Sequence, residues 1–418
     1  MSVRVWRNPF QMCVETEDPW IMRTSCIVDS TIYTLGGCPC VSPEGILQCI
    51  NIPPLKPRCP HDPDPENDFK SVQIKYQPAW LLTDINPLQV RFGAAAAVGS
   101  DIFYFGGHHG PFGNQTFHNT VAHLNPSTRT VSQVNILGSS PTPKANVGMC
   151  SNVKLKECYV FGGLGERPSQ TKGVKTPASY LETIAGAYVN NAVHVLDTRD
   201  YASTGNCTWS EMMCTGNAPD PRFGSAFTNR DNFAYVFGGD CNYMKLRNDL
   251  HRLNLRSAEW SGALPVTGEL PSERCYASLA PSSTSLLVLC GGSWYNGTNL
   301  IQRNDIFIFH TDLLCWYGVN TSHIQPPLEP WWGNYSCQDL MGDVYIVGGY
   351  TSIQNQNRAT TIVRVRTEPP SLQNLALQVY AGIATSEDVE SLGVLFHSVL
   401  RNIRTQPCSR CSPLHAWK

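Results

Sequence analysis

The chain has 418 residues, of which 42% are hydrophobic and 15% charged, with 33 Gly and 30 Pro. The low charged fraction argues against a disordered chain, and a formal net charge of -2 favours neither nucleic acid nor an anionic membrane as partner. A spanning helix is excluded because no run of about 18 apolar residues occurs, and no apolar core of a signal peptide follows the N-terminus. We therefore expect a turn-rich protein of the cytoplasm or nucleus.

Cysteine is abundant, with 17 residues in the chain. Without a signal peptide, these are expected to be free thiols packed in strands. Near the C-terminus, Cys408, Cys411 and His415 offer three ligands, whereas a structural zinc site needs four. We expect no metal there.

An apolar strand that ends in Gly-Gly recurs six times along the chain. The diglycines end at Gly37, Gly107, Gly163, Gly239, Gly292 and Gly349. Their spacings of 53 to 76 residues are close to the ~50 residues of kelch repeats. Each diglycine follows β-branched and aromatic residues, as a strand before a tight turn requires.

Further strands flank most of the diglycine strands. One precedes them, as in the segments that begin at Arg91, Arg222 and Arg274, and another follows and leads to Trp209, Trp260 or Trp316. These strands predict one four-stranded blade per repeat, with the tryptophans packed between blades. The predicted fold is all-β: a six-bladed kelch β-propeller over 15–367. An N-terminal segment, 1–14, is expected to complete the last blade with Val3–Trp6.

The period changes after the propeller. Pro369 and Pro370 precede a pattern of helical spacing that Ser371 can cap, and a second helical pattern follows. The sequence therefore predicts a short helical hairpin over 371–404 and a tail over 405–418. Either the two helices pack under the propeller, or they dock on an adaptor protein.

A family resemblance favours docking. The segments Phe105–His109, Ala192–Thr198 and Asn248–Leu255, with a SLxxL(C/S/A) pattern from Ser371 to Ala376, resemble the kelch-domain-containing substrate receptors of cullin-2 ubiquitin ligases. The resemblance implies that the first tail helix is a BC box that docks on Elongin C within the Elongin B/Elongin C adaptor, and that the second is a Cullin-2 box for a cullin-2-type scaffold. It departs from the family at Tyr380, where an aliphatic residue is usual, and at Ser391-Leu392, which replaces Leu-Pro. The adaptor-binding candidates are Ser371, Leu372, Leu375, Ala376, Val379, Leu392, Leu395 and Val399.

The same resemblance implies that the propeller cup binds the free C-terminus of target peptides, as a C-degron reader. Such a site needs a cation and hydrogen-bond donors for the carboxylate, with aromatic walls around it. Asp240 replaces one family arginine, and a second matches somewhere in Lys245–Arg247. The substrate-binding candidates are Asp240, Lys245, Arg247, Arg274, Cys275, Tyr276, Trp294, Tyr295 and Trp332. Because of Asp240, we expect a peptide tail with Lys or Arg near its end.

The arginines that begin inner strands have two interpretations. Arg91, Arg222 and Arg274 either point into the cup or form structural ion pairs and hydrogen bonds between loops.

Sequence motifs of catalysis are missing from the chain. It contains no Gly-rich phosphate loop, no HExxH and no GxSxG, and the adjacent His108 and His109 diverge in an extended loop. We therefore expect a non-enzyme without catalytic residues, cofactor or metal. Two function classes stay open: a substrate receptor of a ubiquitin ligase, or a kelch scaffold without a ligase role.

Overall fold

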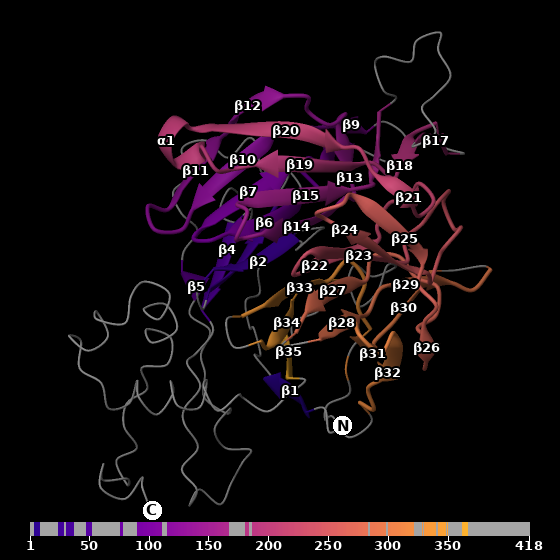
Figure 1. Ribbon diagram of the computed structural model, residues 1–418. Coiled ribbons are helices and arrows are strands. Elements are labelled where there is room, and N and C mark those ends of the chain that lie inside the picture. The colour runs from indigo at the N-terminus through magenta and orange to yellow at the C-terminus, as the bar shows by residue number, and fades with distance from the viewer. Residues whose placement is uncertain are drawn as a thin grey trace, which may run out of the picture.

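The computed structural model describes residues 4–8, 24–28, 31–36, 47–51, 76–77, 90–110, 115–166, 180–183, 186–282, 285–297, 300–321, 328, 330–339, 342–347, 349 and 362–366. The predictions for 371–404 and for 405–418 lie outside these residues. Within the described part, almost all regular structure is β-strand, and its single helix is α1 (Tyr201–Thr204) (Figure 1).

Six sheets of four or five strands make up most of the described chain. The first contains β2 (Thr24–Val28), β3 (Thr31–Leu35), β4 (Leu47–Asn51) and β5 (Tyr76–Gln77). The second contains β6 (Ala94–Val98), β7 (Asp101–Phe105), β10 (Val121–Asn125) and β11 (Thr130–Gln133). The third contains β14 (Gly148–Asn152), β15 (Glu157–Phe161), β19 (Val193–Asp197), β20 (Asn206–Met212) and β12 (Asn135–Gly138).

The remaining large sheets follow the same order from inner to outer strand. The fourth contains β22 (Ala226–Arg230), β23 (Phe233–Phe237), β24 (Leu250–Asn254), β25 (Glu259–Ala263) and β21 (Thr215–Asn217). The fifth contains β27 (Ser278–Pro281), β28 (Leu286–Cys290), β31 (Ile306–His310), β32 (Cys315–Gly318) and β26 (Thr267–Gly268). The sixth contains β33 (Tyr335–Gln338), β34 (Val344–Val347), β35 (Ile362–Arg366) and β1 (Arg4–Asn8).

Short strands form three small sheets beside the large ones. These sheets are β8 (His108–His109) with β9 (Thr116–Phe117), β29 (Ser293–Tyr295) with β30 (Leu300–Gln302), and β13 (Lys144–Ala145), β16 (Leu164–Gly165), β18 (Tyr188–Asn190) and β17 (Tyr180–Glu182). Apart from β13, which leads into β14, their strands lie on the segments that follow the diglycines, so the small sheets mark one end of the large sheets.

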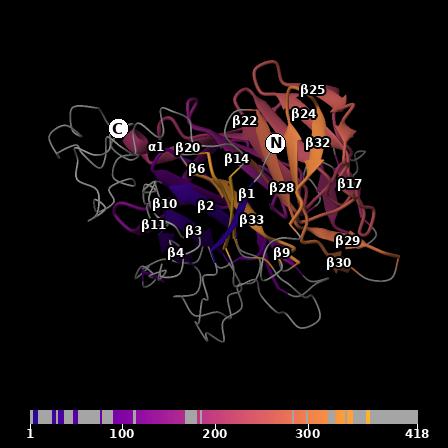
Figure 2. The same ribbon diagram turned by 90° about the horizontal axis from the view of Figure 1, so that it is seen from below.

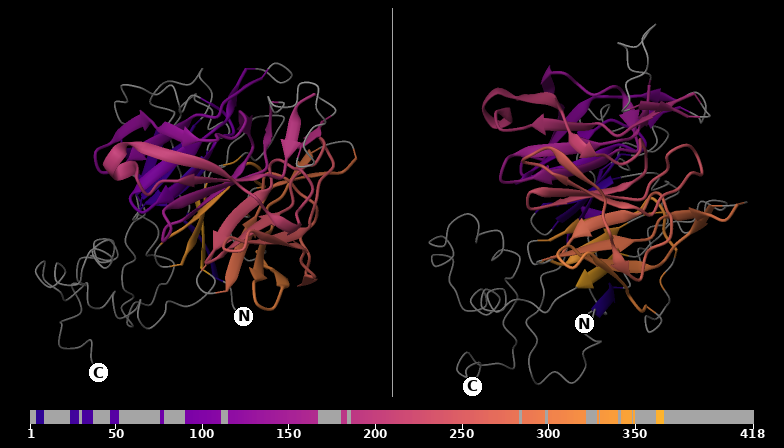
Figure 3. Two further views of the ribbon diagram at one scale, coloured as in Figure 1. Left: turned by 45° about the horizontal axis from the view of Figure 1, so that its top comes forward. Right: turned by 45° about the vertical axis from the view of Figure 1, so that its right-hand side comes forward.

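The inner strands of the six large sheets form a closed ring. In cyclic order β2, β6, β14, β22, β27 and β33 each contact the next, and β33 contacts β2. The colours of Figure 3 show the sheets following one another in chain order around the molecule. This is the arrangement of a β-propeller, in which sheets pack radially around an axis. The N-terminal strand β1 pairs antiparallel with β35, with Trp6 opposite Arg364, and so joins the sixth sheet (Figure 2).

Tryptophans pack between successive sheets, as predicted. Trp209, Trp260 and Trp316 are buried. Each meets, edge to face, the phenylalanine that precedes the diglycine of the neighbouring, preceding sheet. The centroids of the Trp209 and Phe105 rings, for example, are 5.1 Å apart. Aromatic pairs in this geometry add to the stability that burial alone provides.

The diglycines join one sheet to the next. Both glycines have positive φ in the four pairs from Gly106–Gly107 to Gly291–Gly292. The second glycine donates its N–H to a carbonyl at the start of the next sheet, as Gly239 does to Arg274 at 2.9 Å. A side chain on the first glycine would collide with the same carbonyl, because an added Cβ at Gly238 would lie 2.5 Å from the carbonyl oxygen of Arg274. The repeat therefore needs glycine for close approach as well as for its backbone angle.

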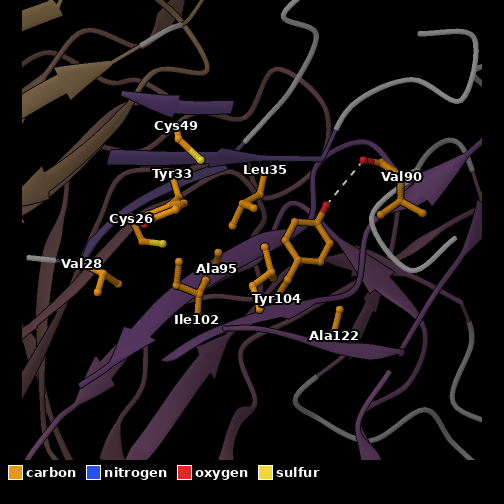
Figure 4. Packing of buried hydrophobic residues seen from close by; sticks show 11 residues of the cluster. Cys26, Val28, Tyr33, Leu35, Cys49, Val90, Ala95, Ile102, Tyr104 and Ala122 are labelled. Atoms are coloured by element: carbon orange, nitrogen blue, oxygen red, sulfur yellow. Dashed lines mark hydrogen bonds between the residues drawn. The ribbon is translucent and has the colours of Figure 1, made fainter. Parts of the chain in front are cut away.

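The core between the first two sheets is small and apolar. Tyr104 of β7 lies against Leu35 and Ala95, and its hydroxyl donates to the carbonyl of Val90 at 3.4 Å (Figure 4). Cys26 and Cys49 lie in the same cluster. All eleven described cysteines are free and nine are buried, which confirms the prediction of packed thiols for this part of the chain.

Candidate functional site

A cavity of about 950 Å³ lies along the axis of the ring. All six inner strands line it, and many of their side chains are small, such as those of Ala94 to Ala97 on β6. Small residues leave the axis open because the inner strands cannot fill it. We call the end of this cavity beside the diglycines the mouth.

At the mouth, the residue two positions before each of five inner strands is in the left-handed backbone region. These residues are Phe92, Asn146, Gly224, Tyr276 and Gly333, with φ between 55° and 62°. A belt of four hydrogen bonds links them: from Asn146 onward, the N–H of each donates to the carbonyl of the one before, at 2.7 to 3.0 Å. Three of the five carry a side chain in a conformation that costs about 1–2 kcal/mol, and such strain concentrates at functional sites.

Aromatic rings span the mouth. Phe92 and Tyr276 come from opposite sides of the ring, yet their ring centroids are 5.8 Å apart. Tyr276 also meets Trp332 at 5.7 Å and Phe223 at 6.3 Å, and Phe223 meets Tyr243 at 5.5 Å. We call these five side chains the aromatic floor. Phe92, Tyr276 and Trp332 line the cavity at this end, whereas Phe223 is buried and supports them from behind.

The structure brings Tyr276 and Trp332 together, as a shared site requires. The neighbouring Cys275 is buried behind the floor, where burial raises the pKa of its thiol. Trp294 lies under Arg303, whose guanidinium is 4.8 Å from the ring centroid. Tyr295 is directed into its own loop, where its hydroxyl donates to the carbonyl of Gly297 at 2.8 Å.

Asp240 shapes a loop. Its carboxylate accepts the backbone N–H groups of Asn242 at 2.9 Å, Met244 at 2.7 Å and Lys245 at 3.2 Å. Burial raises the pKa of Asp240, and these hydrogen bonds oppose that shift. With most of its acceptor capacity taken by its own loop, Asp240 is poorly suited to bind a basic side chain of a ligand.

Arg274 is a structural residue. It is 1% exposed, and all five of its N–H groups donate within the protein: to Asp305, to Ser272 and to the carbonyl of Gly291. Arg222 repeats this arrangement with Asp249 at 2.6 Å. The contacts argue against Arg274 as a carboxylate partner and favour the structural interpretation for both residues.

The two remaining cationic candidates differ. Lys245 is exposed, and its backbone N–H is held by Asp240. Arg247 pairs with Asp220 at 2.5 Å. Lys245 therefore keeps its side chain in solvent, whereas Arg247 is already neutralised.

Sequence reasoning missed Phe92, Phe223, Tyr243 and Arg303. By their letters, Arg91-Phe92 correspond to Arg222-Phe223 of the fourth sheet. The strand register shows instead that Phe92 corresponds to Gly224, because both stand two residues before an inner strand. Each inner strand pairs with the strand that ends in the diglycine. Counting residues from that pairing back to the mouth in each repeat would have shown the shift of one residue.

Histidines gather on the second sheet beside the floor. His108 stacks on Phe92 at 5.6 Å, and burial lowers its pKa to about 4. His109 Nδ1 and His118 Nε2 are 2.7 Å apart and share a hydrogen bond. In the described ranges no three His, Cys, Asp or Glu side chains are placed to hold a metal ion.

The adaptor-binding candidates, from Ser371 to Val399, lie outside the described residues. Among the described helices, none is long and apolar enough to span a membrane.

The fold and the mouth define a class of protein: a β-propeller that serves as a protein-interaction module. Residues 92–349 match the KLHDC2/KLHL20/DRC7 Kelch-repeats domain, and the chain belongs to this family. Propellers of this kind are generally binding modules without catalysis of their own.

Several curated proteins and solved structures are similar to this chain. Kelch domain-containing protein 2 of Bos taurus is 27% identical over 300 residues, which cover 70% of each chain. Kelch domain-containing protein 1 of Homo sapiens is 27% identical over 272 residues, covering 63% of this chain and 62% of that protein. The solved structure of YjhT has a TM-score of 0.56 at 16% identity and covers 84% of this chain and 95% of its own, which supports the fold alone.

Proposed function

We propose that the protein is the substrate-recognition subunit of a cullin-RING ubiquitin ligase. In this proposal the six sheets are the blades of a six-bladed kelch propeller whose mouth binds peptide tails of target proteins. A helical hairpin at 371–404 docks on Elongin C and on a cullin-2-type scaffold. The chain is not the catalyst; ubiquitin transfer belongs to other subunits, in the cytoplasm or nucleus.

The observation that carries this proposal is the aromatic floor. Phe92, Tyr276 and Trp332 reach the mouth from three sheets and meet there. Aromatic side chains supply large anchoring area at low cost in conformational entropy, which suits capture of a peptide. The left-handed backbone at Phe92 and Tyr276 holds these rings at the mouth, at a cost in stability that a purely structural turn would avoid with glycine.

The tail sequence supports the ligase part of the proposal. Leu372, Leu375, Ala376 and Val379 are spaced as one face of a helix and match the BC-box pattern. A pattern of this kind directly after a kelch propeller is typical of Elongin-binding receptors.

Co-purification with Elongin B and Elongin C tests the proposal. We expect the wild-type chain, co-expressed with both, to elute with them as one complex. Leu372→Asp is expected to abolish this co-elution, because an unpaired carboxylate in an apolar pocket costs several kcal/mol. When a cullin-2-type scaffold is co-expressed as well, Leu392→Asp is expected to retain Elongin B and Elongin C and to lose only the cullin.

A matched control is Leu313→Asp, because Leu313 is a leucine of the propeller that is 62% exposed. It should leave the complex intact. Failure of the wild type to retain Elongin B and Elongin C would instead favour a kelch scaffold without a ligase role, and peptide binding at the mouth would then be that scaffold's activity.

A further inference from the structure

Four residues occupy the same place in successive sheets, next to the mouth. These residues are His118, Asn190, Arg247 and Arg303. The N–H of each donates to the carbonyl of the second glycine, and its own carbonyl accepts an N–H from the first residue of the next sheet. Arg303 accepts from Trp331 at 2.7 Å in this way, so it lies beside the backbone that carries Trp332.

Arg303 also borders the backbone that carries Tyr276. Its guanidinium lies on Trp294, and the residue before Trp294, Ser293, exchanges two backbone hydrogen bonds with Cys275 at 2.8 and 3.0 Å. Arg303 and Trp294 therefore lie between the fifth and sixth sheets, at the edge of the aromatic floor.

The two arginines of this set differ in their partners. Arg247 pairs with Asp220, which lies two residues before Arg222. The matching position in the next sheet, two residues before Arg274, is Ser272, whose hydroxyl accepts an N–H from Arg274. Asp220 neutralises Arg247 in the fourth sheet, whereas the matching residue in the fifth sheet, Ser272, has no carboxylate that could neutralise Arg303.

Within the described ranges, no carboxylate pairs with Arg303, and its buried Nε has no hydrogen-bond partner. No described residue accepts a hydrogen bond from the terminal N–H groups of Arg303 either, whereas those of Arg247 are taken by Asp220. This fork of N–H groups suits a planar carboxylate of a ligand.

We propose, on the basis of the receptor function above, that Arg303 on Trp294 binds the terminal carboxylate of the peptide tail. The tail would lie with its last side chains on the aromatic floor and its carboxylate between the fifth and sixth sheets. Arg303 then takes the carboxylate-binding role that the family resemblance gives to the position of Asp240 and to a residue in Lys245–Arg247. Asp240 and Arg247 are both occupied by internal contacts.

Peptide pools with two kinds of C-terminus test this proposal. Immobilised full-length protein is mixed with randomised decapeptides that have either free or amidated C-termini, and the retained peptides are quantified by mass spectrometry. We expect the wild type to retain the free acids about tenfold better, which corresponds to about 1.4 kcal/mol. Arg303→Gln should remove the preference, and Arg303→Lys should keep part of it because the charge remains.

The matched control is Arg252→Gln. Arg252, on β24, lies over the ring of Phe233 at 4.7 Å and so repeats the stacked geometry away from the mouth. It should retain the wild-type preference. Amidated peptides enriched for internal Asp or Glu would show that a side-chain carboxylate is bound instead of the terminus.

Three results would overturn the assignment: equal retention of both pools by the wild type, retention of neither, or an unchanged preference in Arg303→Gln. Elongin co-purification of the same variants reports separately on the ligase role and on folding. A carboxylate preference without Elongin binding would contradict the proposed ligase function and leave the Arg303 site standing.

Discussion

Replacing Gly238 by alanine is expected to lower the free energy of unfolding by about 3 kcal/mol or more. Gly238 has φ +61°, and an added Cβ would lie 2.5 Å from the carbonyl oxygen of Arg274 and 3.1 Å from that of Arg247. The Arg274 carbonyl accepts the N–H of Gly239, so moving it breaks the bond that joins the fourth sheet to the fifth. Urea unfolding followed by tryptophan fluorescence measures the effect.

Gly205→Ala separates backbone strain from collision. Gly205 ends α1 with φ +73°, and no atom lies within 4 Å of an added Cβ. We expect this variant to lose only about 1 kcal/mol. Equal losses in the two variants would contradict the conclusion that the diglycine is required for close approach between sheets.

Lys144→Met is expected to stabilise the protein by a few kcal/mol near pH 6. Lys144 is fully buried at the position of Arg222 and Arg274, and burial lowers its pKa from 10.5 to about 7. Ala192 takes the place of Asp249, and among the described residues Lys144 Nζ makes one hydrogen bond, to Asn190 Oδ1 at 3.4 Å. Methionine fills a similar volume without a charge to desolvate.

The advantage of the Lys144→Met variant should shrink as the pH rises. Between pH 7 and 10.5 the unfolded chain keeps the lysine proton while the folded protein has lost it. Unfolding then takes up a proton, so this group makes the wild type more stable as pH increases. Below pH 7 both states are protonated, and the full desolvation cost is present.

Urea unfolding of both proteins at pH 6, 8 and 10 measures this difference, and other titrating groups cancel between them. Lys154→Met, at an exposed lysine, is the control and should change stability little at any pH. A Lys144→Met protein that is less stable than wild type at pH 6, or a difference independent of pH, would show that the buried amine is well accommodated.

The aromatic mouth illustrates how far residue patterns carry a site prediction. Tyr276 and Trp332 were found because an aromatic wall has a recognisable composition. Phe92 was missed because a register shift of one residue decides which side chain stands at the mouth, and Arg91-Phe92 resembles Arg222-Phe223 too closely to reveal it. Arg303 was missed because its importance depends on Asp220 being matched by Ser272 in the next sheet.

Charge assignments were the least predictable part of the site. From the sequence, Asp240 is predicted to bind a basic side chain of the ligand and Arg274 its carboxylate. In the structure both charges have internal partners: three backbone N–H groups donate to Asp240, and Asp305 pairs with Arg274. A buried charge needs such partners, and only the folded chain determines whether they come from the protein or from a ligand.

The sequence by itself determined the repeated strand, the diglycine joints and the tryptophans between sheets, because these depend on local periodicity and on backbone angles that few residues adopt. The tertiary structure decided which rings meet across the axis and which cations are already paired. Those contacts join residues from different sheets, as Phe92 and Tyr276 show, and their distances follow from closure of the ring, which no local pattern encodes.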